Sequence, residues 1–344
     1  MKAVYLERHG GNDVLQFGER PEPSPGPGEV VVRLKAAAMN RLDLFVRNGI
    51  PGVSISFPHV PGADGYGAVE AVGEGVAGLK PGDAVVIQPG LSDGTCEFCR
   101  SGETSLCVDF RILGEHLSGT FAEKVAVPRE NVFRAPKNLT PEKAAAFPLA
   151  ALTAWRMLVT RAALRPGESV LIHGVGGGVS TFALQIAKVC GASLVIVTSS
   201  SEAKRKRAEA LGADVTIDYT AADVGKKVRE ITGKRGVDVV VDSVGAATWR
   251  ASLTAAAKMG RIVTCGATSG PNPEEEIRII FWKQLSILGS TMGTDSEFAA
   301  LLNVVSAGRI DPVVDEVFPL SDARRAYEHL ESGTGFGKVV VSIG

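Results

Sequence analysis

Three of the five cysteines in the chain lie in one short stretch and have the spacing of metal ligands. In "LSDGTCEFCRSGETSLC", Cys96 and Cys99 form a C-x-x-C pair, and Cys107 follows after seven residues. Thiolates are typical zinc ligands, and a structural zinc takes four ligands in a tetrahedron. The cysteines supply three of the four, so a fourth ligand has to come from another residue type.

A glycine-rich turn is the second chemical signal. The stretch "HGVGGGVS" follows the apolar run "SVLI" and precedes a helical pattern. Backbone N–H groups of such a turn, together with the positive end of the helix, bind a pyrophosphate. We therefore predict that Gly176, Gly177, Gly178 and Val179 bind a dinucleotide. No register gives an unbroken G-x-G-x-x-G, and an ordinary tight turn is the alternative.

Hydroxyl and basic residues follow the next predicted strand, in "VIVTSSSEAKRKRA". An NAD site usually presents a carboxylate to the ribose 2′-OH about 20 residues after the glycine turn. Here Ser199 and Ser200 come first, and Lys204 and Arg205 follow in a helical pattern. These side chains suit a 2′-phosphate, so the sequence favours NADP(H) over NAD(H). Tyr219, after the third strand, is a candidate neighbour of the adenosine end.

Short apolar strands and helical stretches alternate between residues 169 and 289 and predict an α/β fold with a doubly wound parallel sheet. The first 150 residues instead carry many short alternating runs between Gly- and Pro-rich turns, which is typical of an all-β region. Thr140 and Pro141 predict a helix start, and Pro148 should break that helix. The six strands that we expect are "SVLIH", "SLVIVT", "DVTID", "VDVVVD", "GRIVTC" and "LSILGS".

The overall composition excludes several classes of partner. The formal net charge is −1 and 45% of the residues are hydrophobic, so nothing favours nucleic acid or a membrane surface. The start "MKAVYLERHGG" lacks the apolar region of a signal peptide, and no apolar run reaches the length of a membrane span. An odd number of cysteines argues against a disulfide framework. We expect a cytoplasmic protein that acts on a small-molecule substrate.

Six further motifs are spread along the whole chain, namely "VPGADGYGAVEAVGEGVAGLKPGDAVV", "LTAWRML", "LGAD", "VDSVG", "LSILGS" and "FGKVVV". Together they resemble the medium-chain dehydrogenase/reductase superfamily. The resemblance implies a GroES-like catalytic domain in residues 1–150, a Rossmann nucleotide-binding domain in residues 151–293, and a segment, 294–344, that returns to the catalytic domain. It also implies a homodimer or a homotetramer.

The resemblance supplies the missing fourth ligand of the cysteine cluster. Zinc-containing members have a structural lobe with the pattern C-x2-C-x2-C-x7-C, here residues 91–107. Counting back from Cys107 places Asp93 at the first position. Carboxylates bind zinc, so Asp93, Cys96, Cys99 and Cys107 are the predicted ligands of a structural zinc. An empty lobe with reduced thiols is the alternative.

The positions that bind a catalytic zinc in the alcohol dehydrogenases of this family carry other residues. They are Asn40, Ala63 and Leu149 here, and Asp64 stands in the place of the acid in the family's G-H-E motif. Ala and Leu offer no donor atom, so we expect no catalytic zinc. The stretch from Asn40 through Asp43 resembles the zinc-independent quinone oxidoreductases and enone reductases.

The expected activity is therefore hydride transfer from NAD(P)H to a quinone or an enone without a catalytic metal. An alcohol dehydrogenase and a nucleotide-binding protein without turnover are the alternatives. The candidate catalytic residues are Asn40, Asp43, Thr153 and His116. For Asn40 a loop-fixing role is the alternative, and for Asp43 we expect contacts with Arg47 or with backbone amides. The resemblance adds three further candidate cofactor contacts at strand ends, namely Gly266, Gly289 and Lys338.

Overall fold

The computed structural model describes all 344 residues and divides them into two compact units. Unit 1 comprises Met1–Ala150 and Gly293–Gly344, and unit 2 comprises Ala151–Met292. Helix α4 (Pro148–Trp155) crosses from the first unit into the second. None of the helices combines the length and the apolar character that crossing a membrane requires.

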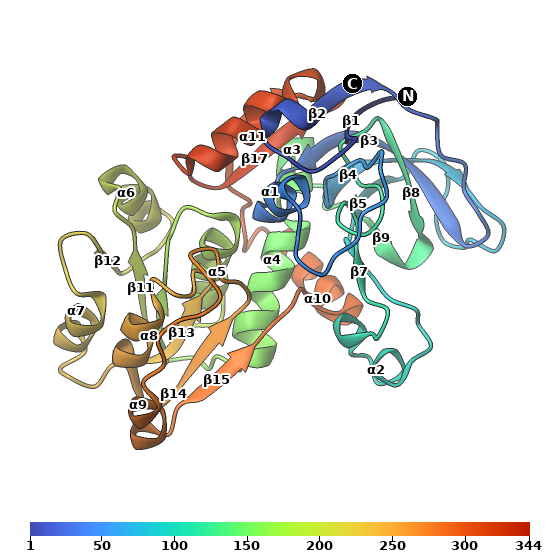
Figure 1. Ribbon diagram of the computed structural model, residues 1–344. Coiled ribbons are helices and arrows are strands. Elements are labelled where there is room, and N and C mark those ends of the chain that lie inside the picture. The colour runs from blue at the N-terminus through green and yellow to red at the C-terminus, as the bar shows by residue number, and fades with distance from the viewer. The chain divides into compact units, whose positions relative to one another are not determined.

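Unit 1 is built on a seven-stranded sheet in the order β16-β17-β3-β4-β5-β9, with β8 paired to β3 as well (Figure 1). The strands of this unit are β1 (Lys2–Leu6), β2 (Leu15–Glu19), β3 (Glu29–Ala38), β4 (Asp64–Val72), β5 (Ala84–Ile87), β6 (Gly90–Leu91), β7 (Arg111–Ile112), β8 (Lys124–Pro128), β9 (Val132–Arg134), β16 (Val314–Pro319) and β17 (Lys338–Ser342). Its helices are α1 (Arg41–Asn48), α2 (Glu97–Arg100), α3 (Pro141–Ala146), α10 (Asp295–Ser306) and α11 (Ala323–Ser332), with 3-10 turns η1 (Asn12–Val14), η2 (Thr104–Leu106), η3 (Arg129–Asn131) and η5 (Leu320–Asp322).

The last strand of the chain completes the sheet of unit 1. β17 pairs antiparallel with β3, with Val340 opposite Ala38, and β3 pairs antiparallel with β4, with Ala38 opposite Asp64. The end of β3, the start of β4 and the start of β17 therefore meet at one place. This pairing brings together residues from opposite ends of the sequence.

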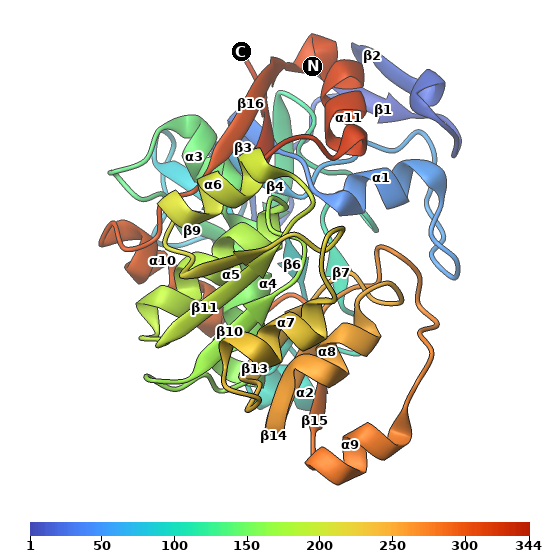
Figure 2. The ribbon, with the colours of Figure 1, turned by 90° about the vertical axis from the view of Figure 1, so that its left-hand side faces the viewer.

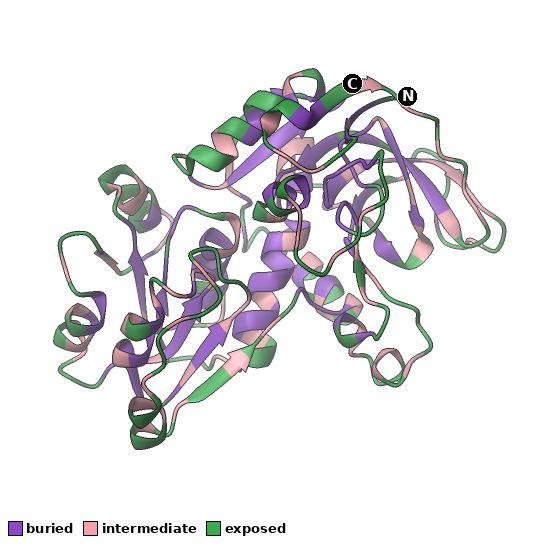
Figure 3. Ribbon diagram, viewed as in Figure 1, coloured by how far each residue is buried: buried purple, intermediate pink, exposed green.

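Unit 2 contains a parallel sheet of six strands, as the sequence predicts, in the order β12-β11-β10-β13-β14-β15. The strands are β10 (Ser169–Ile172), β11 (Leu194–Thr198), β12 (Val215–Ile217), β13 (Val237–Asp242), β14 (Ala256–Thr264) and β15 (Ser286–Gly289). Strands β10, β11 and β13 are almost entirely buried, which explains their continuous β-branched runs (Figure 3).

Helices connect these parallel strands. They are α5 (Gly178–Val189), α6 (Glu202–Ala210), α7 (Val224–Ile231), α8 (Trp249–Ala255) and α9 (Ile277–Lys283), and a π-helix (Arg156–Arg161) continues α4. The strand order reverses between β10 and β13, so right-handed crossovers place the helices before and after this point on opposite faces. α7 and α8 pack side by side (Figure 2).

Two helix boundaries follow from the sequence. Thr140 caps α3 and accepts a hydrogen bond from the backbone N–H of Lys143 at 3.4 Å, and α4 begins at Pro148. α5 begins at Gly178, inside the glycine-rich turn, and is followed by Gly191 at φ +79°. The last turn of α5 therefore ends at a residue that tolerates the left-handed conformation.

Candidate active site and metal lobe

Asn40, Asp64 and Lys338 form a buried polar cluster where β3, β4 and β17 meet. The Lys338 ammonium donates to Asp64 Oδ2 at 2.9 Å and to Asn40 Oδ1, and Asn40 Nδ2 donates to Asp64 Oδ2 at 2.9 Å. The second oxygen of Asp64 accepts the backbone N–H of Leu149 at 2.7 Å. The three side chains thus satisfy one another's hydrogen-bonding groups.

The burial of this cluster is nearly complete. The side chains of Asp64 and Lys338 are 0% and 3% exposed. A buried carboxylate without a partner costs several kcal/mol, and Lys338 supplies the compensating charge. The sequence gives Asp64 no visible partner, because Lys338 lies 274 residues further along the chain.

The contacts in this cluster bear on two of the predicted roles. Both polar atoms of Asn40 are engaged by Lys338 and Asp64, which supports the loop-fixing role for its side chain. The Lys338 ammonium is held by Asp64 and Asn40 inside unit 1, and its predicted contact with a cofactor stays a prediction.

Asp43 organises the backbone around this cluster. Its two carboxylate oxygens accept the N–H groups of Asn40, at 2.6 Å, and of Gly62, at 3.1 Å. Burial raises the pKa of Asp43 to about 7, against these hydrogen bonds and the charge of Lys338, which lower it. The expectation that Asp43 contacts Arg47 or backbone amides is met by the backbone amides, and Arg47 pairs instead with Glu331, 3.0 Å away.

Two of the positions that bind zinc in the metal-dependent alcohol dehydrogenases are filled by apolar side chains. Ala63 is fully buried beside Asp64, and Leu149 contributes its backbone N–H to the same carboxylate. The donor atoms that remain are the amide of Asn40 and the carboxylate of Asp64, and both already contact Lys338. The residues present here do not fit a catalytic zinc.

The glycine-rich turn of unit 2 joins β10 to α5. Gly174 and Gly176 adopt φ values of +66° and +123°, which non-glycine residues rarely do. The Ser180 hydroxyl donates to the carbonyls of Gly174 and Gly177, both at 3.0 Å. Ser180 occupies the third glycine position of the interrupted motif, and its hydroxyl closes the turn by hydrogen bonding.

The turn is also tied to the end of β11. The N–H of Gly174 donates to Thr198 Oγ1 at 3.0 Å, and that of Val175 donates to the Thr198 carbonyl at 2.8 Å. The side chain of Lys204 lies against Gly176, since a Cβ added to that glycine would be 2.9 Å from Lys204 Cδ. The Lys204 side chain therefore lies beside the glycine-rich turn.

The predicted 2′-phosphate residues converge after β11. Tyr219 Oη donates to Ser200 Oγ at 3.1 Å, and the Tyr219 side chain is half exposed. Arg205 donates to the Ser199 carbonyl at 2.7 Å and forms an ion pair with Asp218 at 3.0 Å. Sequence analysis missed Asp218, whose charge neutralises Arg205.

A second polar network follows β13. The Ser252 hydroxyl donates to Asp242 Oδ2 at 2.7 Å and lies 3.0 Å from His173 Nε2. Asp242 Oδ1 also accepts the N–H groups of Val244 and Gly245. Burial lowers the pKa of His173. His173 is therefore a neutral part of the core at the carboxyl ends of β10 and β13.

The remaining predicted cofactor-side residues lie in unit 2. Thr153, in α4, is buried, and its Oγ1 lies 3.9 Å from Met292 Sδ. Gly289 ends β15, and its carbonyl accepts Arg161 Nε at 2.8 Å. Gly266 is exposed after β14. Contact of these residues with a cofactor stays a prediction.

His116 is the candidate proton donor of unit 1. Its Nδ1 accepts the backbone N–H of Ile112 at 3.2 Å. In the neutral ring the proton must then be on Nε2, because Nδ1 is the acceptor. The side chain is 32% exposed, and Nε2–H is the hydrogen-bond donor of the neutral ring.

The four predicted metal ligands converge in the lobe. One ligand atom from each of Asp93, Cys96, Cys99 and Cys107 lies within 4.8 Å of all the others. Two thiolates on a tetrahedral zinc lie roughly 3.8 Å apart, given Zn–S bonds of about 2.3 Å. The Sγ atoms of Cys96 and Cys99 are 3.5 Å apart. This donor set fits a structural zinc, which would cross-link the lobe.

Backbone hydrogen bonds orient these ligands. Asp93 Oδ1 accepts the N–H groups of Cys96, at 2.9 Å, and of Thr95, at 2.7 Å, and these bonds lower the pKa of Asp93. Cys107 Sγ accepts the N–H groups of Asp93 and Asp109, at 3.3 and 3.4 Å. Donors aimed at the Asp93 carboxylate favour its deprotonated form, which is the form that binds a metal.

Comparison with known proteins agrees with this architecture. Residues 26–137 match the model of the alcohol dehydrogenase GroES-like domain, and residues 178–307 match that of the zinc-binding dehydrogenases. A crystal structure of an NAD-dependent alcohol dehydrogenase superposes with a TM-score of 0.97 at 50% identity, covering 100% of both chains.

Two curated relatives span essentially the whole chain. A zinc-type alcohol dehydrogenase-like protein of Schizosaccharomyces pombe is 37% identical, over 100% of this chain and 99% of its own length. An acryloyl-coenzyme A reductase of Metallosphaera sedula is 34% identical, over 99% and 100%. Together with the fold, these matches show that the chain belongs to the medium-chain dehydrogenase/reductase superfamily of oxidoreductases.

Proposed function

We propose that this chain is an NADPH-dependent reductase of carbonyl-conjugated acceptors, such as enones or quinones, that works without a catalytic metal. The observation that carries the proposal is the cluster of Asn40, Asp64 and Lys338. An ammonium group compensates the carboxylate there, and Ala63 offers no donor atom. An acceptor that spreads negative charge over its own conjugated system needs less stabilisation than a simple alkoxide does.

The residues of unit 2 account for the cofactor part of the proposal. We expect the pyrophosphate to be bound by the amides of the turn at Gly176 and Gly177 and by the start of α5. We expect the 2′-phosphate to be bound by Ser199, Ser200 and Lys204. When bound, NADPH supplies the hydride. The hydroxyls and Lys204 favour NADPH, while the NAD-dependent alcohol dehydrogenase at 50% identity favours NADH as the alternative.

The residues of unit 1 account for the acceptor part. Reduction of an enone forms a C–H bond at the β-carbon, and the electron pair of the C=C bond moves toward the carbonyl oxygen as an enolate. A proton then adds at the α-carbon. The imidazolium form of His116 is the proposed proton donor and becomes neutral imidazole on transfer, and Lys338 is a positioning residue that fixes Asn40 and Asp64. The acryloyl-coenzyme A reductase relative is named for such a conjugated carbonyl substrate.

Alcohol dehydrogenation is the second candidate, because the S. pombe relative is named a zinc-type alcohol dehydrogenase-like protein. Steady-state rates separate the two. NADPH oxidation with 2-cyclohexenone or a benzoquinone is compared with NADP⁺ reduction by primary alcohols, each before and after treatment with a chelator. We expect reduction of the conjugated acceptors to survive chelation. Alcohol oxidation that the chelator abolishes would contradict the proposal.

We also propose that the chain forms a homodimer or a homotetramer through the free edge of β15. This strand pairs only with β14, and Ile287 on it is 39% exposed. An unpaired edge strand is a template for pairing with a second copy. Mass measurement by light scattering on the wild type and on Ile287→Pro, which removes an N–H at the edge, tests this proposal. A monomeric wild type would contradict it.

A further inference from the structure

The turn that leads into Lys338 is held by a carboxylate on the neighbouring strand. This turn connects α11 to β17 and has the sequence "GTGFG", residues 333–337. Asp315, on β16, accepts the backbone N–H of Phe336 through Oδ1 at 2.9 Å. Its Oδ2 lies 2.7 Å from Nε2 of His329, on α11. An ionised carboxylate only accepts hydrogen bonds, so Nε2 of His329 carries the proton. Asp315 therefore ties the end of α11 to the start of β17.

Asp315 lies where the pairing of β16 with β17 is irregular. Val314 is opposite Lys338 and Glu316 is opposite Val339, so Asp315 is an extra residue on β16. Such bulges are rare in parallel pairs, and next to a functional site they change the direction in which a side chain points. This irregularity is beside the residue that supplies the ammonium of the buried polar cluster.

The register of β17 decides which way the Lys338 side chain points. Successive side chains of a strand alternate between the two faces of a sheet, so a slip of one residue would move the ammonium to the opposite face. The ladder of β17 with β3 begins at Val340, two residues after Lys338. The N–H of Lys338 donates to the carbonyl of Val313, just before β16, at 2.9 Å. The position of Lys338 therefore depends on contacts with β16 as well as with β3.

The turn approaches β16 closely at two glycines. A Cβ added to Gly335 would lie 2.1 Å from Asp315 Oδ2, so a side chain there would displace the carboxylate. Gly337 adopts a φ of +113°, and a Cβ there would lie 2.4 Å from the carbonyl oxygen of Val313. Phe336, between the two glycines, is 2% exposed. The turn is therefore packed tightly against the strand that carries Asp315.

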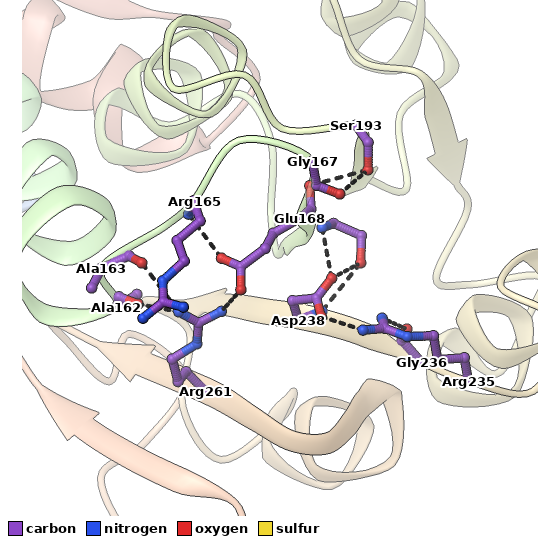
Figure 4. A network of polar contacts seen from close by, with 11 residues as sticks. Ala162, Ala163, Arg165, Gly167, Glu168, Ser193, Arg235, Gly236, Asp238 and Arg261 are labelled. Carbon is purple, nitrogen blue, oxygen red and sulfur yellow. Dashed lines mark hydrogen bonds and ion pairs between the residues drawn. The ribbon is translucent and has the colours of Figure 1, made fainter.

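A second aspartate has the same kinds of contact in the other unit. Asp238 lies where the pairing of β13 with β14 is irregular, and it accepts the N–H of Ser169 at 2.8 Å. It pairs with Arg235 at 2.5 Å (Figure 4). The side chains of Asp238 and Asp315 are 17% and 11% exposed. Asp238 belongs to unit 2, whereas the buried polar cluster belongs to unit 1, so Asp238 is the matched control for Asp315.

We propose that Asp315, with His329, is a positioning residue that fixes the start of β17 so that the Lys338 ammonium reaches Asp64. Loss of the Asp315 carboxylate frees the turn from β16 and withdraws the compensating charge from the cluster. The consequence for turnover rests on the proposed reductase function. The consequence for the placement of Lys338 does not, so the two are tested separately.

Acetylation of the full-length protein with N-hydroxysuccinimidyl acetate, followed by mass spectrometry, tests the placement of Lys338. Its rate is compared with that of Lys124, a buried lysine of the same sheet. Asp315→Ala should raise the ratio of the two rates about 10-fold, because local opening exposes Lys338. Gly335→Ala should raise it as well, since the added Cβ displaces the carboxylate. Asp238→Ala should leave the ratio unchanged.

Asp315→Asn keeps an oxygen for the N–H of Phe336, so its ratio should lie between those of the wild type and Asp315→Ala. This variant also serves where Asp315→Ala does not fold, which circular dichroism and thermal melting decide. An unchanged ratio in a folded Asp315 variant would overturn the proposal. An equal rise in Asp238→Ala would do the same, because it would show a general loss of stability.

The rate of enone reduction tests the part that rests on the proposed function. Asp315→Ala should lower kcat for 2-cyclohexenone about 10-fold, the effect of about 1.4 kcal/mol, and should change KM for NADPH little. A raised acetylation ratio with an unchanged kcat would support the placement of Lys338 by Asp315 and contradict the proposed role of Lys338 in the reductase.

Discussion

The metal lobe and the Asn40–Asp64–Lys338 cluster are both convergent sets of polar side chains, but they differ in the source of the positive charge. In the lobe, three thiols and the Asp93 carboxylate approach one another to within 4.8 Å. In the cluster, an ammonium group lies 2.9 Å from the carboxylate. A set of anionic ligands calls for an external cation, whereas the cluster is already neutralised by Lys338.

Metal binding in this protein therefore cannot be judged from the donor atoms alone. Asp93 stands at the position of the first structural-zinc ligand of the family. Asp64 stands next to the position of a catalytic-zinc ligand. Backbone N–H groups hold Asp93 among three cysteines, and Lys338 occupies the space beside Asp64. The same residue type is thus expected to bind zinc in one region and to form a buried ion pair in the other.

The largest expected effect comes from breaking the buried ion pair. Lys338→Met leaves Asp64 buried without a compensating charge and should lower the free energy of unfolding by about 3–5 kcal/mol. Urea denaturation measures this change. Lys143→Met removes a partner from an exposed ion pair with Asp311 and is the matched control, with an expected cost of about 1 kcal/mol or less. Equal losses in the two variants would show that the cluster is not held by its charges.

Removing one lobe ligand should have the next largest effect. Cys107→Ser should abolish metal binding and lower the free energy of unfolding by about 3 kcal/mol, the value expected for releasing a cross-link across about 15 residues. Elemental analysis and thermal melting measure the two changes. Asp93→Cys should retain the metal, and Cys190→Ser, outside the lobe, should leave metal content unchanged. Retention of one metal per chain by Cys107→Ser would refute the four-ligand assignment.

Cofactor preference should respond to a single lysine. Lys204→Met removes the cation beside the turn and should lower kcat/KM for NADPH about 10- to 100-fold, the effect of one charge-assisted hydrogen bond. The value for NADH should hardly change. Lys206→Met is the control, because Lys206 is exposed and pairs with Glu202. An equal loss with both cofactors would place Lys204 at the pyrophosphate rather than at the 2′-phosphate.

The smallest effect is a pH dependence of stability. The pKa of Asp43 is about 7 in the folded state, above the ordinary aspartate value of 3.8, so near neutral pH the folded protein binds a proton that the unfolded chain has lost. Stability should therefore fall as the pH rises through 7, by about 1.4 kcal/mol between pH 6 and pH 8 from this group. Asp43→Asn should lose this component. A variant with the same slope as the wild type would assign the titration to another group.

The local features of this molecule could be predicted from the sequence. Strands β10, β11 and β13 of unit 2 are apolar runs rich in β-branched residues and are almost entirely buried, and the predicted parallel sheet is confirmed. The lobe ligands lie in one short loop, so their convergence depends only on local turns. In both cases the residues that determine the feature lie close together in the sequence.

The contacts between distant segments could not be predicted. Lys338 reaches Asp64 and Asn40 because β17 pairs with β3, and no pattern in the sequence specifies that pairing. The ion pair of Arg205 with Asp218 depends likewise on the adjacency of β11 and β12. Sequence analysis identified Asn40 and Lys338 as separate candidates, and only the fold shows that they contact each other.

Anomalous scattering at the zinc edge, measured on crystals of the active enzyme, tests the central claim most directly. The account predicts one zinc per chain, bound by Asp93 and the three cysteines of the lobe, and no metal near Asp64, where Lys338 supplies the positive charge. A second anomalous peak within bonding distance of Asp64 or Asn40 would contradict it.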